Sequence, residues 1–106
     1  PGIFRGVLDV RATKITDEIC LAAAFEIAKV AEDKGLSEKY IVPSMDEWEV
    51  FIREAVVVAM KAIDQGLAQV KRNRAELHDM SRKVIIRSRD MVQTLMKENY
   101  IPEPPN

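Results

Sequence analysis

Six consecutive apolar residues, 55–60 (AVVVAM), lie inside a stretch with a helical pattern. A helix with such a centre is apolar around its whole circumference, so it needs neighbours on more than one side. Just before it, Asp46 and Glu49 resemble a capping box, with Asp in place of the usual Ser or Thr. The pattern predicts a helix over about 47–65, buried between two layers. Gly66 marks either a kink in that pattern or nothing more.

Two earlier segments are also expected to be helical. Thr16 is the predicted N-cap of a helix over about 17–33, which carries few polar residues and ends at Gly35. Residues 1–14 are expected to form an opening unit with a short helix, which Gly6 weakens. We expect apolar residues on one side of this helix and polar residues mostly on the other: Phe4, Val7, Leu8 and Ala12 against Arg5, Asp9 and Arg11.

A closing helix is predicted over about 74–98, starting at a capping box formed by Asn73 and Glu76. Its apolar stripe repeats at steps of three and four: Leu77, Met80, Val84, Ile85, Met91, Val92, Leu95 and Met96. Residues 36–44 are a predicted connector because Pro43 stops a helix there, with 40–42 as a short extended piece. Residues 101–106 contain three prolines and predict an extended tail. The isolated chain should therefore be all-α.

The composition argues against several classes of function. A chain of 106 residues suffices for one small domain, and its net charge of −1 creates no overall field toward nucleic acid or an anionic membrane. Cys20 is the single cysteine, which fits a reducing, cytoplasmic location. No apolar run approaches the roughly 20 residues of a membrane span, and no basic-then-apolar leader is seen. The chain starts at Pro1 rather than Met, so we expect it to derive from a longer protein.

Few side chains carry candidate chemistry, and each has a structural interpretation. His78 has no nucleophile beside it and is interpreted as an exposed helix residue. Cys20 follows two acidic residues that oppose a thiolate, so it is expected in the core. Asp46, Glu47 and Glu49 lie in one helical turn, where capping explains them better than metal binding. No catalytic and no metal-binding residue is assigned.

A set of basic residues is the one candidate for nucleic-acid binding: Lys71, Arg72, Arg74, Arg82, Lys83, Arg87 and Arg89. Acidic residues interrupt the set, and no aromatic residues alternate with it for base stacking. It is therefore interpreted as a solvated helix face. Met45, Trp48 and Phe51 are interpreted as core or interface residues, and the chain contains no glycine-rich phosphate loop.

Residues 1–12, PGIFRGVLDVRA, closely resemble the segment after the last strand of the nucleotide-binding domain in bacterial and archaeal malic enzymes. Three more motifs follow in the order of that family: ITDE with LAAA (15–18, 21–24), YIVPS (40–44), and MDEWEVF with REAV (45–51, 53–56). The resemblance implies that 1–70 is the C-terminal helical part of an α/β Rossmann-like NAD(P)-binding domain. It also implies that 71–106 is a C-terminal helical extension with a Pro-rich tail.

The resemblance implies oxidative decarboxylation of malate to pyruvate and carbon dioxide, with NAD or NADP and a divalent metal, usually Mg or Mn. In the family the base, the acid, the metal ligands and the dinucleotide fingerprint all lie upstream of the matched segment. Pro1 and Gly2 match the turn nearest to that site, and they are the only cofactor-binding candidates here. Lys14 and Tyr40 match different motifs from those of the family's base and acid.

The resemblance also implies partners. These helices are expected to pack against the remainder of a malic enzyme chain and to help form a homo-oligomer, without binding nucleic acid or membrane. Alone, the chain is expected to be inactive and to self-associate, because its apolar helices would lack their neighbours. Two alternatives remain open at this point: an independent helical module that binds a protein, and a helical nucleic-acid-binding domain that uses the face over 82–89.

Overall fold

A computed structural model describes residues 2–33 and 48–104, which form four helices: α1 (Gly2–Asp9), α2 (Asp17–Asp33), α3 (Trp48–Asp64) and α4 (Arg74–Lys97). No β-strand lies in these two ranges, where one isolated backbone bridge joins Ala12 to Ala68. The predicted all-α fold is confirmed. The features predicted at Gly35 and over 36–47 lie outside the described residues. Within the described ranges, no helix combines the length and apolar composition needed to cross a membrane.

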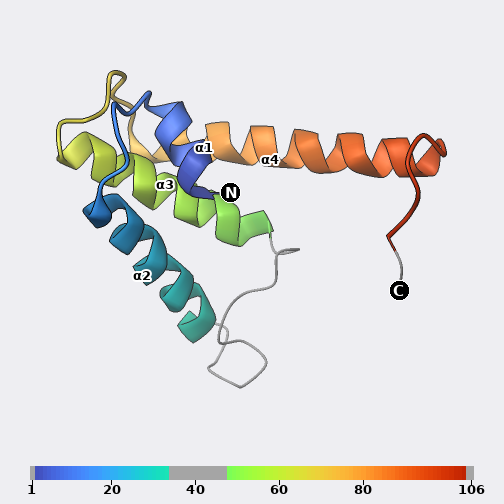
Figure 1. Cartoon of the computed structure of the whole chain (residues 1–106), viewed down its shortest axis with the longest axis horizontal. Coiled ribbons are helices and arrows are strands. Elements are labelled where there is room, and N and C mark those ends of the chain that lie inside the picture. Colours follow the sequence, from blue (N-terminus) through green and yellow to red (C-terminus); the bar gives the residue numbers. More distant parts are fainter. Residues whose placement is uncertain (1, 34–47, 105–106) are drawn as a thin grey trace.

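Helix α3 lies at the centre of the fold, and α1, α2 and α4 each pack against it (Figure 1). Four of the six residues 55–60 are buried, and Val57 and Met60 are half-buried. The predicted burial of this segment is therefore confirmed. The expectation that the run would be exposed in the isolated chain is wrong, because α1, α2 and α4 of the same chain cover it.

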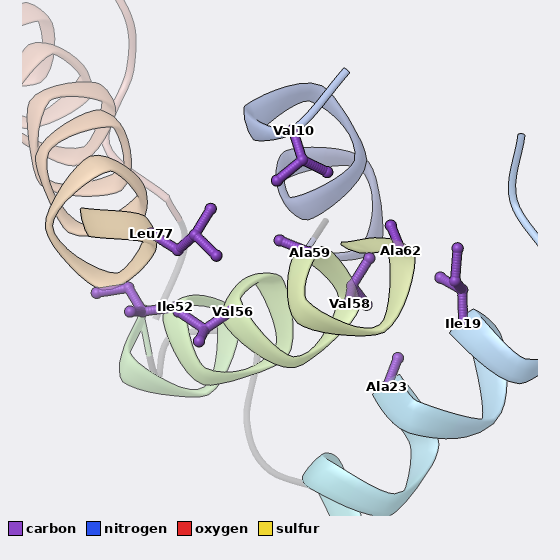
Figure 2. Close-up of a cluster of buried hydrophobic side chains, with 9 residues drawn as sticks. All are labelled: Val10, Ile19, Ala23, Ile52, Val56, Val58, Ala59, Ala62 and Leu77. Atoms are coloured by element: carbon purple, nitrogen blue, oxygen red, sulfur yellow. The ribbon is translucent and has the colours of Figure 1, made fainter. Parts of the chain in front are cut away.

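The core forms around α3 from small and branched side chains (Figure 2). Leu77 of α4 lies beside Ile52, and Val10, which follows α1, lies over Ala59. On the other side of α3, Ile19 and Ala23 of α2 face the end of the helix that carries Ala62 and Val58. Small residues at these positions let the helix axes approach closely, which increases the number of dispersion contacts.

Gly6 is where α1 approaches α3 most closely. A Cβ atom on Gly6 would lie 2.4 Å from the carbonyl oxygen of Ala55 and 2.9 Å from Cβ of Val58. Such contacts are sterically forbidden, so glycine is required for packing even though it disfavours the helix locally. The sequence indicated only the unfavourable effect.

The inward-facing glycines of α1 change part of the orientation that the sequence predicts for this helix. Gly2, Gly6 and Asp9 point inward and are buried. Phe4 and Leu8 are 66% and 62% exposed. The predicted apolar face is therefore wrong for Phe4 and Leu8, whereas Val7 and Ala12 pack against the core as predicted. Close packing of two helix backbones favours the smallest side chains over the most apolar ones.

Polar caps start α2 and α4 at the predicted positions. The Oγ1 atom of Thr16 accepts a hydrogen bond from the backbone N–H of Ile19 at 3.2 Å, and α2 has the predicted bounds. At α4, Oδ1 of Asn73 accepts from the N–H of Glu76 at 2.8 Å, and the Glu76 carboxylate accepts from the N–H of Asn73 at 3.4 Å. The predicted capping box is confirmed.

Both α3 and α4 end with a residue in the left-handed conformation. Gly66 has φ of 72°, and the N–H of Leu67 donates to the carbonyl of Ala62 at 2.9 Å. This is a Schellman motif, so Gly66 terminates α3 and is neither a kink nor without structural effect. Asn99, with φ of 62°, ends α4 in the same way. Residues 101–104 are not helical, in agreement with the predicted tail.

Candidate functional site

The start of α1 contains the only cofactor-binding candidates from the sequence, Pro1 and Gly2. Pro1 lies outside the described residues. Gly2 is buried against α3, where an added Cβ atom would lie 2.7 Å from Cβ and 2.8 Å from Cγ and Cδ of Glu54. Position 2 therefore accepts only glycine while Glu54 keeps this conformation.

Glu54 is a buried carboxyl group that the sequence analysis did not identify. It accepts a hydrogen bond from the backbone N–H of Ile3, one of the first N–H groups of α1, which have no partner within the helix. Burial raises the pKa of Glu54 because surroundings of low polarity disfavour the carboxylate. Its side chain can therefore hold the start of α1. The only sequence signal was its position directly before the apolar run 55–60.

A group of polar side chains, which we call the polar joint, connects α1 to α4. Ser81 Oγ donates a hydrogen bond to Oδ2 of Asp9 at 3.0 Å, in a buried position. Arg5 Nε donates to Oδ1 of Asp9 at 2.9 Å, and Arg72 Nε donates to the Asp9 backbone carbonyl at 3.3 Å. The prediction that Asp9 lies on the solvent side is wrong. Its charge can be buried because one guanidinium and one hydroxyl compensate the lost hydration.

The other candidate residues do not converge on a site. His78 is exposed, as predicted. Cys20 is also exposed, so the expectation that it packs in the core is wrong. The reason is helical geometry: α2 directs Ile19 and Ala23 toward α3, and the next position along from Ile19 is rotated by about 100°.

The described residues contain no group of three or more His, Cys, Asp or Glu side chains that could hold a metal ion. Glu49 is exposed, while Asp46 and Glu47 lie outside the described residues. The acidic turn therefore has no described partner from another segment, and the residues present do not form a metal site for the cation that the sequence resemblance implies.

Most of the basic set lies on the solvent side of the fold. Arg82, Arg87 and Arg89 are exposed, and Lys83 pairs with Asp79 at 2.8 Å on the surface of α4. The interpretation as a solvated face is confirmed for these residues. Arg72 differs, because it is half-buried and belongs to the polar joint.

The apolar stripe of α4 is covered over only part of its length. Leu77 is buried against the core, and Ile85 is half-buried beside it. Beyond this point α4 projects away from the other three helices (Figure 1). We call residues 84–97 the arm. Along the stripe of the arm, four apolar side chains are exposed: Val84, Met91, Val92 and Leu95. The sequence predicts the stripe correctly, but much of it has no described neighbour.

Helix α2 also has an uncovered face. Its inner side packs on α3 through Ile19, Ala23, Val30 and Ala31. On the opposite side Phe25 is 73% exposed, together with Leu21 and two alanines. We call this surface the outer face of α2, comprising Glu18, Leu21, Ala24, Phe25, Ala28 and Glu32. Among the described residues, α2 therefore has neighbours on its inner side alone.

The chain is similar to malic enzymes in both sequence and structure. The bifunctional malic/malolactic enzyme of Bacillus subtilis is 38% identical over 86 residues, which are 81% of this chain and 21% of the relative. The crystal structure of Entamoeba histolytica malic enzyme matches with a TM-score of 0.92 and 38% identity, over 99% of this chain and 22% of that chain. The malic enzyme from Pyrococcus horikoshii matches with a TM-score of 0.81 and 38% identity, over 92% and 22%. No protein-family model matches.

A match over 99% of the chain includes α4, so this helix has a counterpart in the Entamoeba enzyme. The chain spans about a fifth of the length of these three proteins. A helical unit with uncovered apolar faces, which matches part of larger proteins, is typical of one segment of a larger enzyme. That enzyme is a malic enzyme: the relatives in sequence and in structure are malic enzymes, and the chain corresponds to a segment of them. Neither of the two alternatives is favoured by these matches.

Proposed function

We propose that the chain is the C-terminal segment of a malic enzyme and that it contributes packing and subunit-interface helices rather than catalytic groups. The parent enzyme would oxidatively decarboxylate malate to pyruvate and carbon dioxide, with NAD or NADP and Mg or Mn. The observation that carries the proposal is the structural match of nearly the whole chain to part of the Entamoeba enzyme. A location in the cytoplasm accompanies it, supported by the single cysteine.

Within the parent, we assign residues 1–70 to the helical end of the NAD(P)-binding domain and 71–106 to an extension. Pro1 and Gly2 would form a turn next to the cofactor. The side chain of Glu54 would stabilise this turn through its hydrogen bond to the N–H of Ile3. No metal ligand and no proton-transferring group is assigned to the described residues, which contain no suitable acidic cluster.

A complementation experiment tests the catalytic part of the proposal. The purified chain is mixed with the separately produced upstream portion of a related malic enzyme, and malate-dependent reduction of NAD or NADP is followed with Mn²⁺ present. We expect activity from the mixture and none from the chain alone. Pyruvate formation by the chain alone, or equal activity of the upstream portion with and without it, would contradict the proposal. A Gly6→Leu variant, which cannot pack α1 on α3, is the control for a folded chain.

The interface part of the proposal rests on the uncovered apolar side chains of α1, α2 and α4. Removing such surfaces from water stabilises an assembly by about 25 cal/mol for each Å² of apolar area buried. In the parent these helices would contact the remainder of the enzyme and a second subunit. The isolated chain should then self-associate. Sedimentation equilibrium at high micromolar concentration tests this expectation, and a monomer throughout would refute it.

A further inference from the structure

Two connections of the chain lie side by side at one end of the helices (Figure 1). Residues 10–16 join α1 to α2, and residues 65–73 join α3 to α4. The carbonyl of Val10 accepts hydrogen bonds from the N–H groups of Gln69 and Val70 at 3.0 and 3.1 Å. The N–H of Thr13 donates to the carbonyl of Leu67 at 3.0 Å. These backbone bonds hold the two connections together as one surface.

This surface is basic. Residues 10–16 and 65–73 contain no aspartate and no glutamate, but they contain four basic residues. We call these four the basic end: Arg11, Lys14, Lys71 and Arg72. Arg72 is half-buried, and the other three are exposed. The basic end therefore has a local excess of positive charge, although the net charge of the chain is −1.

The acidic residues that flank the two connections in sequence do not neutralise the basic end. The Asp9 carboxylate is buried in the polar joint, and Asp64 pairs with a lysine of its own helix at 3.8 Å. Asp17 and Glu18 lie in the first turn of α2, where the helix dipole favours negative charge, and Glu18 also hydrogen-bonds to Gln65. Among the described residues, no ion pair joins a carboxylate to any of the four basic side chains.

Arg11 has an unusual backbone conformation. Its φ is 50°, in the left-handed region that residues other than glycine rarely adopt. The chain turns out of α1 here: the N–H of Arg11 donates to the carbonyl of Leu8 at 3.2 Å, and the N–H of Ala12 donates to that of Val7 at 3.0 Å. Glycine would form this turn at a lower free-energy cost. An arginine at such a position indicates that its exposed side chain has a role other than folding.

The guanidinium of Arg72 is held in place by the backbone beside Arg11. Its Nε atom donates to the carbonyl of Asp9 at 3.3 Å. A guanidinium has five N–H donors, so this bond leaves the four donors of the two Nη atoms for a ligand. Thr13 and Gln69 are exposed on the same two connections and supply neutral donors. The basic end thus combines a partly fixed guanidinium with mobile lysine charges.

These groups favour a small anion of high charge. A phosphate group carries about 1.5–2 negative charges at pH 7 and has several acceptor oxygens, which match the fork of a guanidinium. Two such groups would balance four positive charges. Nucleic acid is less suitable, because residues 10–16 and 65–73 contain no aromatic side chain on which a base could stack.

We propose that the basic end binds a small polyanion with two or more phosphate groups, and that it recognises the phosphates themselves. Arg11 and Arg72 bind phosphate oxygens through their guanidinium groups, and Lys14 and Lys71 add positive charge around them. This site goes beyond the proposed function, because it requires neither catalysis nor assembly. It can therefore be tested on the chain alone.

Calorimetric titration with inorganic tripolyphosphate tests the site. The titration uses about 0.15 M salt, which screens exposed charges beyond roughly 8 Å. We expect saturable binding of one tripolyphosphate per chain. Arg11→Gly should weaken this binding at least about tenfold and also raise the melting temperature, because glycine adopts the left-handed conformation without strain. A loss of affinity together with a gain in stability separates a binding role from a structural one.

Two further variants make the test specific. Lys14→Ala with Lys71→Ala should also weaken binding, whereas Arg87→Ala should not. Arg87→Ala is the matched control, since it removes one positive charge from an exposed position of α4 outside the basic end. Equal losses in Arg11→Gly and Arg87→Ala would overturn the proposal, as would the absence of saturable binding. Citrate that binds as tightly as tripolyphosphate would overturn the choice of phosphate groups.

Discussion

The two halves of α4 have the same type of sequence but different surroundings. In the first half, Leu77 and Ser81 are fully buried against α1 and α3. In the second half, Met91 and Leu95 continue the same stripe at steps of three and four, and both are exposed. The comparison shows that an amphipathic pattern predicts which face of a helix is to be covered, but not whether the covering residues belong to the same chain.

The largest expected effect is a difference in stability between two leucine-to-alanine variants, one in each half of α4. Leu77→Ala should lower the free energy of unfolding by about 2–5 kcal/mol, because it leaves a cavity in the core. Leu95→Ala should cost about 1 kcal/mol or less, since its side chain is exposed on the arm. Urea titrations at low protein concentration, followed by the fluorescence of Trp48, measure both. Equal losses would show that the arm packs on its own chain.

A second comparison uses two aspartates near the first half of α4, one buried in the polar joint and one exposed on the helix surface. Asp9→Asn should cost about 1–3 kcal/mol, because the buried joint loses its ion pair with Arg5 and the bond from Ser81 is altered. Asp79→Asn should have no measurable effect, since the pair of Asp79 with Lys83 lies in solvent. Thermal unfolding of the two variants tests this difference. If both variants changed the melting temperature by a similar amount, the polar joint would contribute no more to stability than a surface ion pair does.

The smallest expected effect concerns pH. The pKa of Glu54 is raised in the folded state, so folding favours its protonated form. The stabilising contribution is present at low pH and declines as the pH rises from the unfolded pKa through the folded pKa. Glu54→Gln removes this decline, so the stability of the variant relative to the unaltered chain should increase between about pH 4 and 7. Chemical denaturation across this range measures it.

Glu49→Gln, at an exposed position on the same helix, is the control for a general charge effect. A stability of Glu54→Gln relative to the unaltered chain that falls as the pH rises would contradict the assignment of a buried environment that favours the protonated carboxyl group.

Much of the fold could be predicted from local chemistry. Thr16 and Asn73 mark helix starts because their side chains satisfy backbone N–H groups within a few residues. The orientation of α1 could not be predicted in this way. Gly6 and Asp9 face inward because of Ala55 and Ser81, which are far away in sequence, and a pattern read within one helix contains no information on those neighbours.

The candidate site was less predictable. Gly2 was identified through family resemblance, whereas Glu54 was missed, because a single glutamate before an apolar run has no distinctive spacing. Cys20 was assigned to the core from the general burial of cysteine, which is an average over proteins. Cys20 is exposed instead, because it lies one position after the buried Ile19 and therefore points in a different direction from α2.

The polar joint also sets the direction in which the rest of α4 projects from the fold. From Ser81 to Lys97 the helix extends over about 24 Å at 1.5 Å per residue. A tilt of about 5° at the joint would therefore displace the far end of α4 by about 2 Å, which exceeds the tolerance of close side-chain packing. The hydrogen bonds to Asp9 thus determine the positions of Met91 and Leu95, although both residues are far from Asp9 in the sequence.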